Sequence, residues 1–416
     1  MKGENRVSIK KQLISKGVHM PSPESVEIGQ DVDPDRISGD RVVIHGGCRI
    51  YGGSTLISKG TIMGHEGPAT VVDCQVGPGV RLNSGFFQKS VFLKGVSMGS
   101  GSHVRAGTIL EEEASVAHTV GLKQTILFPW VTLGSLINFC DCLMSGGTGP
   151  RDHSEVGSSY IHFNFTPFQD KATPSLIGDV PKGVMLNQPP IFLGGQGGLV
   201  GPCRLGFGTV IAAGSICRKD ESRNSRLIFE GRPRGGNIPY SNGPPKSLKR
   251  ILINNLSYIG NLKALLQWYG KVRRLFISED FPEALFKGLL DALHSCINER
   301  IHQLGKLVFR LSEFEAPYPG TIQNADFPLT RQKDELIRNW PELETLLHRE
   351  PDAFDNPAVR DDFLRQIEGI VSTQGLNYLS VIKALGSETA EQGSRWLQCI
   401  VDGIVSESLK RIPTFV

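Results

Sequence analysis

Hydrophobic residues recur every six positions in three stretches of this chain. The first stretch has aliphatic residues at Ile44, Ile50, Leu56 and Ile62, and two later stretches repeat the pattern over 104–122 and 193–217. A period of six fits neither the 3.6-residue turn of an α-helix nor the two-residue alternation of a strand. It fits a chain that turns a corner after each short strand and points one aliphatic residue inward per edge. The pattern therefore predicts a β-solenoid of hexapeptide repeats.

Small residues stand beside these aliphatic positions, as in "LGFGTV" and "IAAGSI". Glycine suits tight corners because it adopts positive φ without a steric penalty. A β-sandwich with chance spacing is the alternative, and three runs of four or more repeats argue against it. The six-residue register slips at 63–75, 83–90 and 144–190, which predicts loops that leave the coil.

The repeat stops at the Gly/Pro-rich stretch "GRPRGGNIPYSNGPPKS", and a helical pattern follows. Apolar residues then recur at three- and four-residue steps from Leu285 to Leu311, which predicts one face of a helix. We expect further helices over 247–270, 332–348, 357–372 and 388–411. The predicted organisation has four parts, which are a helical N-terminal extension (1–24), a solenoid domain (25–235), a linker (236–246) and an α-helical domain (247–416).

Composition limits the classes of function. A net charge of +3 gives no reason to expect a nucleic-acid partner. No stretch approaches the roughly 18 apolar residues of a membrane span, and "MKGENRVSIKKQLISKG" has no apolar run typical of a secretory signal. The eight cysteines are scattered rather than arranged as a disulfide framework. We therefore expect a cytoplasmic protein with reduced thiols and no membrane contact.

One long string carries a family resemblance: "SLIGDVPKGVMLNQPPIFLGGQGGLVGPCRLGFGTVIAAGSICRKD". It resembles the C-terminal, left-handed β-helix half of bifunctional N-acetylglucosamine-1-phosphate uridyltransferases. That family has "IGD", "LVAP" and "GATIAAGTTVTRD" where this chain has residues 177–179, 199–202 and 208–220. The resemblance extends more loosely upstream to about residue 104 and is absent from the helical part. It implies a left-handed β-helix acetyltransferase domain without the uridyltransferase half, whose Gly-rich nucleotide loop has no counterpart here.

The resemblance also implies residues that bind the substrate. Lys123 matches a sugar-phosphate lysine in the coil before the catalytic histidine. Asn164 and Phe165 stand where the family has an "NY" pair, so the amide is kept and the phenolic hydroxyl is lost. Lys171 is the nearest match to a second sugar-binding lysine. The implied ligand is a sugar phosphate or a nucleotide sugar related to UDP-N-acetylglucosamine.

The family binds acetyl-CoA beside small residues on the coils that follow the substrate loop. Gly195 and Ala213 occupy those places, and Arg232 in "EGRPRGG" is a candidate to bind a phosphate of the cofactor. Acetyl-CoA or another acyl-CoA is the implied co-substrate. The family's sites lie between neighbouring subunits, so the resemblance also implies a homotrimer packed along the solenoid axes.

The family's general base is missing. Where the family reads "AGHLTYLGD" this chain reads "LGSLINFCD", so Ser135 replaces the histidine. N-acetylation requires the removal of a proton from the ammonium group, and a serine hydroxyl does not titrate in the right range. The candidates for this role are His162, His118 and Glu155, and we expect Glu155 to orient His162. For either histidine the alternative is a hydrogen-bonded side chain in a corner of the coil.

The segment "YIHFNFTPFQDKATPSLIGDV" interrupts the aliphatic repeat with aromatic residues. Tyr160, Phe163, Phe165 and Phe168 are candidates to form the wall of a sugar site. The alternative is that these rings only pack the loop onto the coil.

The stretch "CDC" at 140–142 predicts two thiols on one face of a strand, because side chains alternate along it. With His153 and His162 nearby it suggests zinc, but the spacing does not match paired cysteine ligands, and packing inside the coil is the favoured interpretation. We therefore predict no metal site. A zinc trimer of the carbonic-anhydrase type stays a minor alternative.

Three functions remain open from the sequence. The first is a CoA-dependent acyltransferase that acts on a sugar phosphate or nucleotide sugar. The second is a regulatory protein that binds the sugar nucleotide but has lost the base. The third is a scaffold whose helical domain recruits a partner.

Overall fold

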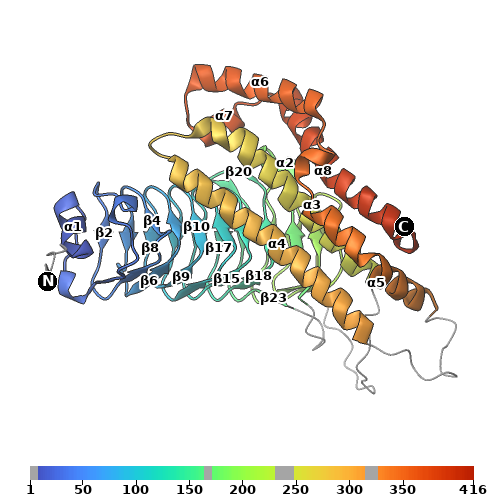
Figure 1. Cartoon of the computed structure of the whole chain (residues 1–416), viewed down its shortest axis with the longest axis horizontal. Coiled ribbons are helices and arrows are strands. Elements are labelled where there is room, and N and C mark those ends of the chain that lie inside the picture. Colours follow the sequence, from blue (N-terminus) through green and yellow to red (C-terminus); the bar gives the residue numbers. More distant parts are fainter. Residues whose placement is uncertain (1–7, 164–170, 230–247, 314–326) are drawn as a thin grey trace, which may run out of the picture.

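The computed structural model describes residues 8–163, 171–229, 248–313 and 327–416. A parallel β-solenoid occupies the first half of the chain, and a group of helices follows it (Figure 1). The predicted fold class is thereby confirmed. A short helix, α1 (Ile9–Lys16), precedes the first strand and lies at one end of the coil.

Three parallel sheets form the faces of the solenoid, which we call faces A, B and C. From β2 to β27, each coil contributes one strand to each face in turn. Face A contains β2 (Val43–Ile44), β5 (Ile62–Met63), β8 (Arg81–Leu82), β11 (Ser97–Met98), β14 (Ser115–Val116), β17 (Thr132–Leu133), β22 (Glu155–Val156), β25 (Phe192–Leu193), β28 (Val210–Ile211) and β30 (Leu227–Ile228).

Faces B and C follow each face A strand around the coil. Face B contains β1 (Glu27–Ile28), β3 (Arg49–Tyr51), β6 (Ala69–Val72), β9 (Gly85–Gln88), β12 (Ser102–Val104), β15 (Gly121–Lys123), β18 (Asn138–Cys140), β23 (Ile161–Phe163), β26 (Gly198–Val200) and β29 (Ile216–Cys217). Face C contains β4 (Leu56–Ile57), β7 (Gln75–Val76), β10 (Ser90–Phe92), β13 (Thr108–Leu110), β16 (Ile126–Leu127), β19 (Cys142–Met144), β24 (Ser175–Ile177) and β27 (Arg204–Leu205).

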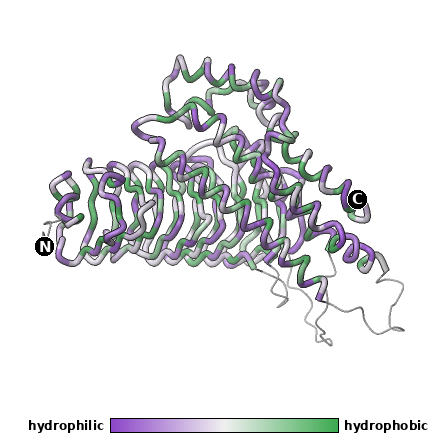
Figure 2. Tube along the Cα trace, viewed as in Figure 1, coloured by the Kyte–Doolittle hydropathy of each residue, from purple (hydrophilic) through white to green (hydrophobic). Residues whose placement is uncertain are grey.

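The six-residue period places one apolar side chain of each strand inside the coil, where it stacks on its counterpart one coil away. On face A, Val116 pairs in register with Leu133 and with Met98, and all three are at most 3% exposed. Figure 2 shows hydrophobic residues recurring coil after coil along the solenoid. Because this burial is continuous along the axis, each coil depends on its neighbours for its core.

Positive φ at the corners is not restricted to glycine. At the corner between faces A and B, Thr119, Leu136, Ser159 and Gln196 have φ between 54° and 62°. Such conformations are unfavourable for residues with a Cβ and persist only where the surrounding packing enforces them. The regular stacking of the coils supplies that packing, so the corners do not require glycine in every coil.

The register slips have two different structural causes. At 63–75 and 83–90 the coil stays intact and has longer strands, β6 and β9, so the predicted loops there are wrong. The slip at 144–190 does mark excursions from the coil. These include a hairpin of β20 (Gly147–Gly149) and β21 (Asp152–His153), and a short helix, α2 (Val180–Gly183).

Helices cover face C. The long helix α4 (Glu283–Glu313) packs against β7, β10 and β13, and α3 (Leu248–Gln267) packs against β24 (Figure 1). The remaining helices are α5 (Phe327–His348), α6 (Pro357–Gln374), α7 (Tyr378–Lys383) and α8 (Ser387–Arg411). Across the described ranges, no helix is both long and apolar enough to cross a membrane. Faces A and B therefore carry the solenoid surface that these helices leave uncovered.

Candidate substrate site on face B

A serine and a histidine from adjacent coils meet at the corner between faces A and B. Ser135 follows β17, His118 follows β14, and these two strands pair in register. The Oγ atom of Ser135 lies 2.8 Å from Nδ1 of His118. The His118 side chain is exposed. Ser135, which replaces the family histidine, thus contacts a histidine one coil earlier.

The hydrogen bond to Ser135 determines which nitrogen of the His118 imidazole is left to accept a proton. If Nδ1 carries the proton and donates it to the Ser135 hydroxyl, Nε2 is left as an acceptor. An exposed imidazole whose orientation is fixed through one nitrogen and whose other nitrogen is a free acceptor is a suitable general base. The backbone N–H of Ser135 donates in turn to Oγ of Ser158 on the next coil, at 3.2 Å, which holds the corner in place.

Three cations surround the opposite edge of face B. Lys123 ends β15 and pairs in register with Cys140, which ends β18. Burial raises the pKa of the Cys140 thiol and Asp141 adds to the rise, whereas the charges of Arg105, Lys123 and Lys171 act to lower it. Nη2 of Arg105 lies 4.0 Å from Sγ of Cys140, and Lys123 lies beside Cys140 on the adjacent strand. Arg300 bonds both the backbone of Lys171 and the carboxylate of Asp141, which brings Lys171 to the same edge. This cluster is a candidate site for an anionic group.

The outward surface of face B connects the serine–histidine pair to the three cations. Asn138 is exposed on β18, between the Ser135 corner and Cys140. The position beside it on β15 is Gly121, which presents no side chain, and an added Cβ there would lie 3.3 Å from Oδ1 of Asn138. From Ser135 to Cys140 the chain advances five residues, or at most about 16 Å. With side chains reaching inward from both ends, this distance suits one sugar phosphate.

A buried ion pair supports the cationic edge from behind. Arg300 on α4 pairs with Asp141 at 2.9 Å and also donates to the backbone carbonyl of Lys171 at 3.2 Å. Asp141 occupies the corner after Cys140 with φ of 62°. The helical region thereby fixes both the Cys140 corner and the backbone of Lys171.

His162 lies inside the coil. Its imidazole is 6% exposed, and Nε2 lies 2.9 Å from Oγ of Ser175. Burial lowers the pKa of His162 to about 4, although a hydrogen bond to the Cys140 backbone opposes this effect. A neutral, enclosed and fully hydrogen-bonded imidazole serves a structural role, so the geometry favours His118 over His162 as the base.

Glu155 and His162 face opposite sides of the solenoid wall. Glu155 is exposed on the outer surface of β22, whereas His162 points inward from β23. The expected pairing in which Glu155 orients His162 is therefore wrong. Tyr160 is likewise buried, with its ring packed edge-on against Phe139 at 6.2 Å, so it does not form a wall of an open sugar site.

The two thiols of the "CDC" stretch lie on different faces. Cys140 ends β18 on face B, Asp141 turns the corner, and Cys142 begins β19 on face C. The prediction that both thiols lie on one face is therefore wrong. Within the part of the chain that the structure describes, no group of three or more His, Cys, Asp or Glu side chains is arranged to hold a metal ion. The imidazole of His153 instead bonds the carbonyl of Pro150 at 2.9 Å.

The positions predicted to meet the acyl donor lie on later coils, on the same A–B corner as His118 and Ser135. An added Cβ at Gly195 would lie 2.7 Å from the backbone oxygen of Ser158, so close packing of coils by itself requires glycine there. Ala213 is exposed one coil further on. Asn164, Phe165, Phe168 and Arg232 lie outside the described residues.

Sequence reasoning missed Arg105 and Arg300. Arg105 follows β12 and stands one coil before Lys123, 18 residues earlier in the sequence. This spacing of three hexapeptides could have identified it. Arg300 belongs to a helix that packs on face C, and no local signal links it to residues 141 or 171.

No family model matches the chain, but comparison with curated proteins finds relatives. It is 25% identical over 230 residues to the bifunctional protein GlmU of Oleidesulfovibrio alaskensis, a match covering 55% of this chain and 45% of that protein. The corresponding proteins of Pelobacter propionicus and Thermotoga sp. are each 28% identical, over 224 and 216 residues. These matches cover 54% and 50% of this chain, and 43% and 41% of the two relatives.

The molecule is thus a parallel β-solenoid of hexapeptide repeats with a helical region on one face. About half of the chain is similar to bifunctional GlmU proteins, and the chain spans less than half the length of those relatives.

Proposed function

We propose that this protein is an acyl-CoA-dependent N-acyltransferase that acts on an amino sugar carrying a phosphate or nucleotide group. The observation that carries the proposal is the 2.8 Å contact between Ser135 and His118. It supplies an exposed imidazole beside the position where the family has its histidine. The similarity to GlmU proteins supports the substrate class.

The substrate would lie along face B. Its phosphate binds among Arg105, Lys123 and Lys171, because clustered cations stabilise a doubly charged anion. Its amino group then lies toward the corner that holds His118. Asn138, between the two ends, offers an amide to the sugar hydroxyls.

The chemistry requires one proton acceptor. The amine attacks the thioester carbonyl, and Nε2 of His118 takes the proton that the nitrogen loses. The carbonyl re-forms as the CoA thiolate leaves, and His118 returns the proton to that sulfur. Ser135 acts as a positioning residue, since it holds Nδ1 and leaves Nε2 available.

The acyl donor and the neighbouring subunits are further parts of the proposal. Gly195 and Ala213 continue the A–B corner past Ser135, where a pantetheine arm would pass close to the backbone. A homotrimer would contact through faces A and B, because α3 and α4 cover face C. Three exposed apolar residues in register on face A, Phe192, Val210 and Leu227, support such a contact.

The test is thiol release from acetyl-CoA with glucosamine 1-phosphate as the acceptor, measured with the full chain. We expect turnover by the wild type and a 100- to 10,000-fold lower kcat in His118→Ala, as is typical for loss of a general base. Glucosamine 1-phosphate should still protect His118→Ala against thermal unfolding. Binding of UDP-N-acetylglucosamine without turnover of any acceptor would favour the regulatory alternative, and a wild-type rate in His118→Ala would rule out this base.

A further inference from the structure

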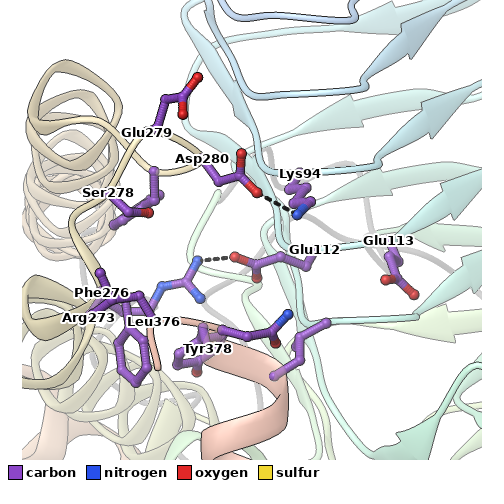
Figure 3. Close-up of a pocket in the computed structure, with 13 residues that line it drawn as sticks. Lys94, Glu112, Glu113, Arg273, Phe276, Ser278, Glu279, Asp280, Leu376 and Tyr378 are labelled. Atoms are coloured by element: carbon purple, nitrogen blue, oxygen red, sulfur yellow. Dashed lines mark hydrogen bonds and ion pairs between the residues drawn. The ribbon is translucent and has the colours of Figure 1, made fainter. Parts of the chain in front are cut away.

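A cavity of about 380 Å³ lies at the junction between the solenoid and the helical region (Figure 3). Lys94 and Glu112 reach it from solenoid corners that follow strands of face C. The opposite wall comes from the segment between α3 and α4 and from the start of α7, and includes Arg273, Phe276 and Tyr378. None of these residues belongs to the face B site.

Arg273 is buried in the wall of this cavity with only part of its guanidinium satisfied. Its side chain is 1% exposed, and Nη2 pairs with Oε1 of Glu112 at 2.5 Å. Among the described residues, Nε and Nη1 of Arg273 and Oε2 of Glu112 have no hydrogen-bond partner. Unsatisfied polar atoms at a buried position are costly, and a bound group that reached them would supply the missing bonds.

Aromatic rings hold the guanidinium in position. The centre of the guanidinium lies 3.8 Å from the ring centroid of Tyr378 and 5.0 Å from that of Phe281. Phe276 packs edge-on against Tyr378 at 5.3 Å. The donors of Arg273 are therefore preorganised rather than free to rotate toward water.

The charges of the cavity wall are already paired within the protein. Asp280 contacts Lys94 at 2.6 Å and Lys59 at 2.9 Å, and Glu279 contacts Lys59 at 3.0 Å. Glu113 accepts a hydrogen bond from the indole of Trp130 at 3.0 Å. An anionic ligand would meet four carboxylates, and a cationic ligand would meet the charges of Arg273 and Lys94.

We propose that this cavity binds a neutral polyhydroxylated ring, namely a mono- or disaccharide. Each hydroxyl group both accepts and donates, so adjacent hydroxyls satisfy the Arg273 donors and the Glu112 acceptor without adding charge. Carboxylates, an arginine and aromatic edges around one cavity match the polar and apolar surfaces of a sugar ring. The volume lies in the range of small-ligand sites, roughly 300–1,000 Å³.

A ligand in this cavity would contact the solenoid through Glu112 and the helical region through Arg273 and Tyr378. It would therefore stabilise the junction by mass action, since it binds only when both parts are in place. The same coil continues from Glu112 through β14 to His118, so the two sites share a structural element.

The test uses saturation-transfer NMR and calorimetric titration of the full chain with glucose, N-acetylglucosamine and cellobiose. Glucose 6-phosphate and glucosamine serve as the charged comparison probes. We expect at least one neutral sugar to bind, with the charged analogue of the same ring at least tenfold weaker. Failure of all three neutral sugars to bind at 20 mM would overturn the proposal, as would tighter binding of a charged probe that Leu376→Trp weakens and Lys123→Ala does not.

Two variants assign any binding to the cavity. Leu376 lines the opening and is 48% exposed, so Leu376→Trp fills the cavity without removing buried contacts, and Ile14→Trp is a matched control on α1 at 43% exposure. Binding should weaken at least tenfold in Leu376→Trp and stay unchanged in Ile14→Trp. Lys123→Ala, which alters the face B site, should also leave it unchanged. The proposal fails if Leu376→Trp binds as the wild type does or if Lys123→Ala abolishes binding.

Discussion

Faces B and C arise from the same six-residue repeat, yet they use their charged residues in opposite ways. At face C, Arg273 and Arg300 have side chains that are 1% and 2% exposed, and each pairs with a carboxylate of the solenoid. At face B, Arg105 is exposed and Lys123 is half-buried. A buried charge must be matched by the protein itself, whereas a surface charge is free to meet a ligand. Covering one face therefore buries its charges in a junction, and the charges of the uncovered face stay open to a ligand.

The sharpest way to break this comparison is to remove a cation from each face. Arg300→Met should lower the free energy of unfolding by about 3–5 kcal/mol, because it leaves the Asp141 carboxylate buried without its partner. The matched change Lys123→Met should alter stability by less than about 0.5 kcal/mol. Urea denaturation of both variants gives the measurement. Equal losses would show that the two faces do not differ in this way.

His162 and His118 differ in the same way, because His162 is buried inside the coil and His118 is exposed. The pKa of His162 is about 4 in the folded chain because it is buried, and it returns to about 6.5 on unfolding. The unfolded state therefore binds more protons between these values, so this histidine's contribution to stability is complete above pH 6.5 and is lost as the pH falls toward 4. The loss approaches about 3 kcal/mol at the acid end.

The measurement is the difference in unfolding free energy between the wild type and His162→Gln at several pH values. Burial raises the pKa of Glu111 to about 7, which makes stability depend on pH in the opposite direction. Because Glu111 is present in both proteins, the difference between them cancels its contribution. We expect the wild type to lose its advantage over His162→Gln as the pH falls below 6.5. A flat difference for His162→Gln would mean that His162 is not enclosed.

A smaller effect tests how closely α4 approaches face C. A Cβ added at Gly288 would lie 2.4 Å from Cγ of Gln75 on β7, so Gly288→Ala should cost about 1 kcal/mol or more despite its better helix propensity. Gly369 in α6 has nothing within 4 Å of an added Cβ, and Gly369→Ala should stabilise by about 0.5–1 kcal/mol. The midpoint temperature of thermal unfolding should therefore fall in Gly288→Ala and rise in Gly369→Ala. A gain of stability in both variants would mean that α4 lies further from the sheet than the structure shows.

Much of the fold could be predicted from the sequence because its signals are local. The six-residue period defined the solenoid, and the helical periodicity located α3, α4, α5, α6 and α8 within a few residues of their observed ends. The short helix α7 was missed because six residues carry too little periodicity. The corner at Asp141 was also missed, since alternation along a strand gives no sign of a turn within it.

The site was harder to predict because its contacts join different coils. Ser135 lies 17 residues after His118, nearly one coil of three hexapeptides, so counting coils could have placed them together. The same count fails for His162, because the excursions within 144–190 interrupt the register. The junction cavity depends on how helices pack on face C, and a local pattern in one segment does not contain that information.

The central claim is that the proton acceptor has moved one coil, from position 135 to His118. Its most direct test is to move it back and measure the rate of acetyl transfer to glucosamine 1-phosphate. The account predicts that His118→Ala is nearly inactive and that adding Ser135→His to that variant restores the rate at least tenfold, because an imidazole again faces the same amine. Wild-type activity in His118→Ala, or no recovery on adding Ser135→His, would contradict it.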